Sequence, residues 1–509
     1  MASSDEDDSL VQYGINDKPP LSESLFLGFQ HYLTMVGANI AVPLILAGAM
    51  GMPEEIIPRF VGTFFVVSGA ATLAQTTFGN RYPIVQGAPF SMLAPALAVV
   101  GVVTANPPAG IAAWRAALLQ LQGAIIIAAI AEVLIGYLGL IGKLRNYLSP
   151  VIIAPVIALI GLSLFNSPDV ITADQNWWLL GLTLVAIVAF SQYLGEQSKA
   201  FKLFPVLLGI VVAWVVAASL SVAGVFTPGT PGYVDLASVA AADPVYPIYP
   251  LQWGTPGVTP AFVIGMLAGV AASIVESIGD YHAVARLSGM GAPSSKRMTH
   301  GIGMEGVMNV FSGLMGTGGS TSYSENIGAI GLTGVASRYV VQVGAVLMLV
   351  VGFVGYFGQL VATIPSPIIG GLYIAMFGQI IAVGLSNLKY VDLDSSRNVF
   401  IIGISLFAGL AVPAYMRSVG SVDAFQQGLT NTVLLGPYLG TDVVASTVYV
   451  IGSTSMAVGG LIGLFLDNTI AGTAEERGLA AWEESAETDA DFATAYDRFV
   501  SDEEPVRAD

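Results

Sequence analysis

Carboxylates placed inside otherwise apolar stretches are the feature that most constrains this chain. Glu276 and Asp280 lie four residues apart in AFVIGMLAGVAASIVESIGDYHAVARL, and that spacing puts them on one face of a helix. Glu325 lies in the glycine-rich run SENIGAIGLTG. An acidic side chain at the centre of a bilayer costs roughly 2.5–3.5 kcal/mol on translocon scales, so it is kept where it faces protein or water. These carboxylates therefore indicate a proton or solute site within a membrane.

The amino-acid composition indicates a membrane protein. Of 509 residues, 54% are hydrophobic and 10% are charged, whereas about 25% of the residues in a soluble domain are charged. Apolar runs of about 20 residues recur along the chain, which predicts an all-α polytopic protein. The net charge of −17 comes mostly from the two ends, since residues 1–23 and 467–509 hold 19 acidic and 4 basic residues. We expect solvated acidic tails that do not bind nucleic acid.

We predict fourteen transmembrane segments in two halves of seven. The first half covers residues 24–224 and the second covers residues 259–467, with an extracellular linker at 225–258 and cytoplasmic tails at 1–23 and 468–509. With the N-terminus inside, twelve Lys and Arg residues fall on the cytoplasmic side and only Arg59, Arg115 and Arg417 fall outside, as the positive-inside rule requires. Because seven is odd, the two halves are inserted in opposite orientations and form inverted repeats.

The third segment of each half is interrupted. RYPIVQGAPFSMLAPALAVVG is broken by Gly87, Pro89 and Pro95, and GGSTSYSENIGAIGLTG is broken by Gly318, Gly319, Gly328 and Gly331. Paired interruptions at matching positions are the best sequence indication of a transporter binding site. Short extended stretches, residues 82–86 and 321–323, are expected to pair across the centre because unpaired backbone is too costly in lipid.

Polar side chains near these interruptions complete the candidate site. Glu325 and Asn326 place a carboxylate beside an amide, a pair suited to in-plane hydrogen bonds with a flat heterocycle. Gln30 and His31 form a second polar pair inside an apolar span, more suited to bracing the helices, with Asp280 and Asn326 as partners for His31.

Two further residues are candidates. Glu305 is a polar anchor in GIGMEGVMN, and Phe90 follows the first interruption, where stacking on a planar solute and simple packing are equally consistent with the sequence. No Lys or Arg falls near the middle of a span at this site, and no Walker A motif is present. An ion gradient or the solute's own gradient must therefore supply the energy.

At these residues the chain resembles the nucleobase–ascorbate transporter family, also called nucleobase:cation symporter 2, which includes uracil and xanthine permeases. ENIGAIGLTG at 325–334 fits the family motif at every position. Gln30-His31, ESIGD at 276–280 and QGAPF at 86–90 resemble the motifs of segments 1, 8 and 3. The resemblance extends from about residue 25 to residue 467.

The resemblance implies a homodimer in which a core domain (segments 1–4 and 8–11) moves like an elevator against a gate domain (segments 5–7 and 12–14). It also implies that Glu276 and Glu325 hydrogen-bond the base, together with backbone groups around Ala88 and Phe90. Gln30, His31, Asp280, Glu305 and Asn326 match positions tied to coupling or to the architecture of the site.

We therefore predict a secondary active transporter in the plasma membrane, not an enzyme, that needs no cofactor. It is expected to import a nucleobase by symport with a proton, with sodium as the less favoured ion. Glu325 resembles uracil-type members and Gly334 resembles xanthine and urate members, so the substrate is placed in the uracil or xanthine class. The alternatives are an anion or ascorbate-type carrier or channel on the same fold, and a membrane enzyme or receptor. The enzyme or receptor has no metal-ligand cluster or nucleophile–base spacing to support it.

Overall fold

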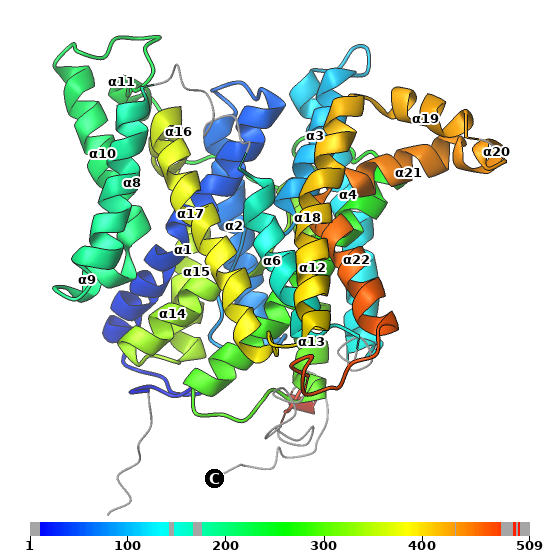
Figure 1. Ribbon diagram of the computed structural model, residues 1–509. Coiled ribbons are helices and arrows are strands. Elements are labelled where there is room, and N and C mark those ends of the chain that lie inside the picture. The colour runs from blue at the N-terminus through cyan, green and yellow to red at the C-terminus, as the bar shows by residue number, and fades with distance from the viewer. Residues whose placement is uncertain are drawn as a thin grey trace, which may run out of the picture.

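The computed structural model describes residues 11–141, 147–165, 176–432, 434–479, 492–494 and 497–498, apart from the Glu325 side chain. The predicted acidic tails therefore lie largely outside the described residues. The described chain is mostly helical and forms one bundle of upright helices (Figure 1).

The helices pack in two groups, defined by which helices contact one another. We call the first the core group. Its members are α1 (Leu21–Met50), α2 (Ile57–Thr77), α3 (Leu93–Ala105), α4 (Ala113–Tyr137), α12 (Pro260–Leu287), α13 (Ser295–Met315), α14 (Ser324–Thr333), α15 (Arg338–Phe353) and α16 (Gly355–Ala362).

We call the second set the gate group. Its members are α6 (Pro150–Ser163), α8 (Trp177–Val188) with the π-turn η1 (Ala189–Tyr193), α9 (Lys199–Leu203), α10 (Pro205–Val222), α17 (Ser366–Ser386) with the 3₁₀ turn η2 (Asn387–Tyr390), α18 (Ser396–Val419) and α22 (Ser455–Thr469). The short helices α11 (Leu236–Ala240), α19 (Val422–Thr430) and α20 (Gly436–Leu439) lie toward the upper end in Figure 1, where α19, α20 and α21 (Asp442–Gly452) project sideways from the bundle.

Seven of the described helices are long and apolar enough to cross a membrane: α1, α2, α4, α10, α12, α17 with η2, and α18. The pair α21 and α22 makes an eighth if its 93° bend is accepted within one span. Four shorter apolar helices, α3, α6, α8 with η1, and α15, lie within the two halves predicted from the sequence. The structure therefore confirms a polytopic helical membrane protein, while the count of fourteen segments stays a prediction.

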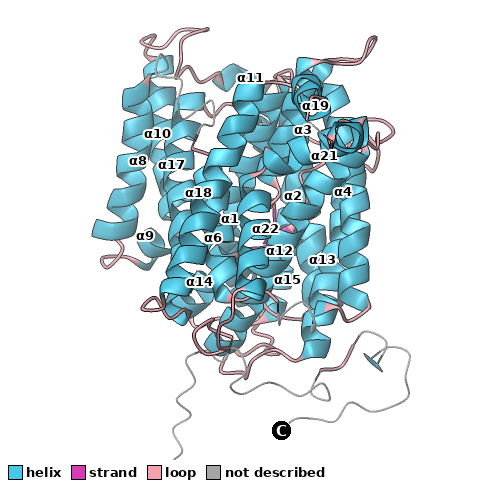
Figure 2. Cartoon of the chain, turned by 45° about the vertical axis from the view of Figure 1, so that its right-hand side comes forward, coloured by secondary structure: helices cyan, strands magenta, loops and turns pink. Residues whose placement is uncertain are grey.

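The two interrupted segments meet at mid-height, as predicted. Strand β1 (Gln86–Gly87) pairs antiparallel with β2 (Thr321–Ser322), with Gln86 opposite Ser322 and Gly87 opposite Thr321. Figure 2 shows this small sheet in the interior of the bundle. The first strand begins at the last residue of the predicted stretch 82–86. The pairing satisfies backbone groups that the broken helices leave open, which lipid would not do.

Close helix packing holds the core group together. A Cβ atom added at Gly136 of α4 would lie 2.3 Å from the backbone nitrogen of Gly303 in α13, so the two helices touch backbone to backbone. Helices in lipid associate through such small residues because no hydrophobic effect drives them together there. This contact fixes α4 beside α13, the helix that carries Glu305.

Candidate functional site

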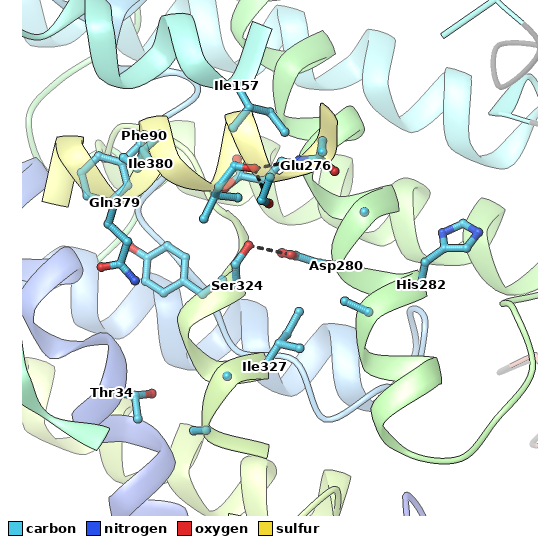
Figure 3. Close-up of a pocket in the computed structure, with 18 of the residues that line it drawn as sticks. Thr34, Phe90, Ile157, Glu276, Asp280, His282, Ser324, Ile327, Gln379 and Ile380 are labelled. Carbon is cyan, nitrogen blue, oxygen red and sulfur yellow. Dashed lines mark hydrogen bonds between the residues drawn. The ribbon is translucent and has the colours of Figure 1, made fainter. Parts of the chain in front are cut away.

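A cavity of about 600 Å³ lies between the two groups of helices (Figure 3). This volume falls within the range of small-molecule sites. From the core group its wall includes Phe90, Glu276, Asp280, Tyr323 and Ser324, and from the gate group Ile153, Ile157, Gln379 and Ile380. The cavity extends to a basic rim formed by Lys202, Arg286 and Lys389. Because both groups line it, a movement of one group against the other changes its shape.

Glu276 and Asp280 reach the cavity from α12, one helical turn apart, as the sequence predicts. Glu276 is half-buried and Asp280 is 5% exposed. Asp280 accepts a hydrogen bond of 2.6 Å from Ser324 Oγ, drawn in Figure 3. Its second oxygen accepts one of 2.6 Å from Ser322 Oγ. Asp280 therefore links α12 to the second interrupted segment, at β2 and the first residue of α14.

Glu305 lies behind the cavity wall and does not line it. The side chain is 1% exposed and belongs to α13. Hydroxyl groups surround its carboxylate: Ser273 Oγ at 2.8 Å, Ser277 Oγ at 2.6 Å and Thr321 Oγ1 at 3.1 Å. Glu305 thus links α13 to α12 and β2.

Asn326 joins the two interrupted segments to α1. Its side-chain nitrogen lies 2.9 Å from His31 Nδ1, and its side-chain oxygen accepts a hydrogen bond of 2.9 Å from the backbone N–H of Val85. Both His31 and Asn326 are buried and neither lines the cavity. The predicted contact between His31 and Asn326 is present. Gln30 faces a second, smaller cavity beside Leu33 and Phe204.

Of the two candidate residues at the first interruption, Phe90 lines the cavity and Ala88 does not. Phe90 lines the cavity and packs edge-on against Phe377, with ring centroids 6.3 Å apart. Ala88 lies behind it, where its N–H donates to Asn39 Oδ1 at 3.1 Å and its carbonyl accepts from Tyr323 Oη at 2.7 Å. Glu325 is the second residue of α14, and its side chain lies outside what the structure describes.

Several residues of this region were not predicted from the sequence. Tyr323, Ser324 and Gln379 line the cavity, and Ser322 contacts Asp280. The hydroxyl-rich run STSYSE around the second interruption was the available signal for three of them. Gln379, a single amide in an apolar helix, carried a weaker one.

Glu132, to which the sequence assigned no role, is fully buried in α4. One of its carboxylate oxygens accepts a hydrogen bond of 2.9 Å from Asn309 Nδ2 in α13. Its other oxygen has no hydrogen-bond partner. A second fully buried carboxylate, besides Glu305, therefore lies within the core group.

Sequence comparison matches residues 22–418 to the Permease family that includes xanthine and uracil permeases. Human solute carrier family 23 member 2 is 41% identical over 92% of this chain and 76% of its own length. Nucleobase-ascorbate transporter 12 of Arabidopsis thaliana is 33% identical, over 96% of this chain and 75% of its own. Nucleobase-ascorbate transporter 2 of the same plant is also 33% identical, over 93% and 91%.

Two solved structures share the architecture. The transmembrane domain of the cyanobacterial bicarbonate transporter BicA aligns with a TM-score of 0.54 at 17% identity, over 77% of this chain and 96% of that one. The structure of SLC26A9 aligns with a TM-score of 0.53 at 14% identity, over 77% and 63%. At these identities the likeness concerns the fold alone.

Proposed function

The chain belongs to the nucleobase–ascorbate transporter family, a family of membrane transporters and not of enzymes, and from this premise we propose that it imports a nucleobase together with a proton. The cavity between the two groups of helices is the proposed solute site. Sodium is the less favoured coupling ion.

The observation that carries the proposal is the meeting of Glu276, Phe90 and the first turn of α14 at one cavity. A carboxylate accepts the N–H groups of a base, and the amide of Gln379 both donates and accepts. The first N–H groups of a helix have no intrahelical partner, so the start of α14 offers donors to the carbonyl groups of a base. An aromatic ring such as Phe90 offers a face or edge to a planar heterocycle.

Glu325 and Asn326 narrow the proposed substrate to the uracil or xanthine class. They fill the family motif with a carboxylate and an amide, and Glu325 is the residue that resembles uracil-type members. Lys202, Arg286 and Lys389 at the rim would attract an ascorbate anion, but Glu276 and Asp280 in the cavity wall would repel it, since like charges at close range repel. A neutral base with N–H donors is therefore the better match.

Proton coupling is proposed because carboxylates at membrane depth bind protons and no nucleotide-binding motif is present. One charge that crosses 100 mV releases about 2.3 kcal/mol, or roughly a fifty-fold concentration ratio, so one proton is enough for scavenging. We further propose an elevator-like slide of the core group against the gate group, a homodimer, and a plasma-membrane location with both termini in the cytoplasm.

Uptake into proteoliposomes tests the proposal. Radiolabelled uracil, xanthine, ascorbate and bicarbonate are offered with and without an imposed pH gradient. Uracil or xanthine should accumulate only with the gradient, and Glu276→Gln should abolish or uncouple uptake. Glu55→Gln, a change at an exposed carboxylate, is the matched control and should transport normally. Accumulation of ascorbate or bicarbonate instead would establish the alternative carrier, and gradient-driven accumulation by the Glu276→Gln protein would remove the proposed role of Glu276.

A further inference from the structure

Three short contacts lead from the cavity to the buried Glu305. Asp280 Oδ2 lies 2.6 Å from Ser322 Oγ, Ser322 Oγ lies 2.9 Å from Ser277 Oγ, and Ser277 Oγ lies 2.6 Å from Glu305 Oε2. All three separations are hydrogen-bond distances for oxygen pairs. Asp280 lines the cavity at one end, and Glu305 is almost fully buried at the other.

The three contacts need one proton more than the two serine hydroxyls supply. Each contact needs one hydrogen between its two oxygens, so three contacts need three hydrogens. Ser277 and Ser322 supply one each. If both carboxylates were ionised, each serine would donate to its own carboxylate, and the two serine oxygens would face each other at 2.9 Å without a hydrogen between them. One further proton, on Asp280 or on Glu305, completes all three bonds.

The charges around Glu305 favour that extra proton, whereas the basic side chains Lys202, Arg286 and Lys389 line the same cavity as Asp280. Glu132 of α4 accepts a hydrogen bond from Asn309, which lies one turn along α13 from Glu305, so a second buried carboxylate adjoins the helix that carries Glu305. From α12, the titratable side chains facing Glu305 are Asp280 and Tyr281. In the described part of the chain neither Glu305 nor Glu132 forms an ion pair with a basic residue. Like charges in a dry environment disfavour full ionisation.

Helix α2, which also packs on α13, brings no compensating charge. Its one charged residue, Arg59, hydrogen-bonds Gln252 and lies over the rings of Tyr249 and Trp253. No cation from α2 is therefore available to balance the carboxylates near Glu305.

We propose that Ser277 and Ser322 relay a proton between Asp280 and Glu305, an inference that rests on the proposed proton symport. In the transfer, protonated Asp280 gives its hydrogen to Ser322 Oγ, Ser322 gives its own to Ser277 Oγ, and Ser277 gives its own to Glu305 Oε2. Three O–H bonds break and three form, both serines remain neutral hydroxyls, and one proton moves from the cavity wall to Glu305. The transferred proton is then held away from solvent while the solute crosses.

The structure supplies a matched control for this relay. Ser273 lies one turn before Ser277 on α12 and also donates to Glu305, at 2.8 Å. Its other contact is Thr321 Oγ1 at 2.7 Å, and it is not part of the path to Asp280. Ser273→Ala removes a hydrogen bond from Glu305 and leaves the relay intact, whereas Ser277→Ala interrupts it.

The experiment compares coupled and uncoupled transport of the labelled base in proteoliposomes. A pH-sensitive dye reports the protons that enter with the solute, and solute exchange at equal pH needs no net proton movement. Ser277→Ala should lower pH-driven accumulation and dye response roughly tenfold or more, as loss of a positioned proton donor does. Exchange should stay within about twofold of the unmodified protein, because the cavity wall is unchanged. Ser273→Ala, and Ser277→Thr with its hydroxyl retained, should both remain coupled.

Two results would overturn the relay: normal coupling in Ser277→Ala, or equal loss in Ser273→Ala and Ser277→Ala, which would mean that Glu305 needs only its hydrogen bonds. If Ser277→Ala does not fold, the same test is made at the second serine: Ser322→Ala interrupts the relay, and Ser322→Thr, which retains a hydroxyl, is its control. A failure of the proposed function looks different. In that case the unmodified protein itself takes up solute without a dye response.

Discussion

Gly87 is the position at which a single methyl group should do most damage to the proposed solute site. A Cβ atom added there would lie 2.7 Å from two atoms of the Tyr323 ring and 3.0 Å from its hydroxyl oxygen. Ordinary contacts of a Cβ atom begin at about 3.4 Å, so in Gly87→Ala the ring must withdraw by about 0.7 Å. The ring is 2% exposed and lines the cavity, so it has little room to move except into the solute's space.

The expected cost has two parts. Overpacking a close-packed site costs about 1–3 kcal/mol. Moving the ring also strains the 2.7 Å hydrogen bond from Tyr323 Oη to the Ala88 carbonyl, worth about 1 kcal/mol. Since about 1.4 kcal/mol corresponds to a tenfold change in affinity, we expect the KM of Gly87→Ala for the base to rise at least about tenfold.

Uptake kinetics in proteoliposomes measure this effect. Gly101→Ala is the control, because a Cβ atom there meets nothing within 4 Å and alanine favours the helix α3. A double-mutant cycle with Tyr323→Leu assigns the effect, since removing the ring tip should make Gly87→Ala nearly neutral. An unchanged KM in Gly87→Ala, or an equal penalty with and without the Tyr323 ring, would refute the reasoning.

Three further changes probe other parts of the fold. Asp467→Asn leaves Arg397 and Arg477 without the carboxylate that they contact at 2.9 and 2.7 Å. The gate group should therefore lose about 3–5 kcal/mol of stability. Thermal unfolding in detergent measures this loss, and an unchanged midpoint would contradict it. Gly136→Ala forces α4 away from α13 and should cost about 1–3 kcal/mol in the same assay, whereas Gly378→Ala, with nothing near its Cβ, should not. Phe492→Ala removes a buried ring that lies 4.7 Å from the Arg297 guanidinium, and truncating a buried aromatic side chain costs about 3–5 kcal/mol, so the midpoint of thermal unfolding should fall; an unchanged midpoint would show that this ring adds no stability.

Much of this architecture was predictable because the membrane simplifies the physics. Apolar length alone identifies helices such as α1, α4 and α12. The pairing of the two interruptions was also predictable, since open backbone needs a partner in lipid. Four-residue spacing predicted that Glu276 and Asp280 share one face of a helix, and in the structure both lie on α12 and line the cavity.

The direction of the helices after a bend and the position of the short strands were harder to predict from the sequence. The apolar run 446–467 reads as one span, yet the chain bends by 93° between α21 and α22. Hydropathy measures transfer from water and carries no information on direction. Likewise the strand at Gln86–Gly87 is positioned by distant partners such as Asn326, which binds the N–H of Val85. A two-residue strand has no pattern of its own.

The hydroxyl groups that surround the carboxylates were the main omission within the site. Serine is common on membrane helices, and one such as Ser277 differs from others only by what it touches. Its contacts with Glu305 and Ser322 join residues far apart in the sequence. A carboxylate in an apolar segment is conspicuous in the sequence because burying its charge in a membrane costs free energy. The serine hydroxyls that donate hydrogen bonds to it are not conspicuous in this way.

The distribution of charge between the two groups suggests why proton and solute would move together. Glu276, Asp280, Glu305 and Glu132 all belong to the core group, while the facing wall of the gate group presents Ile153, Ile157 and Ile380, with Lys202 and Lys389 at its rim. A carboxylate that slides along an apolar wall loses solvation, at a cost that a protonated acid largely avoids. The proposed slide would therefore be slow for the ionised core group and faster once a proton is shared between Asp280 and Glu305. A bound base that hydrogen-bonds Glu276 would lower the remaining cost, so coupling would follow from desolvation without any direct contact between the proton and the solute.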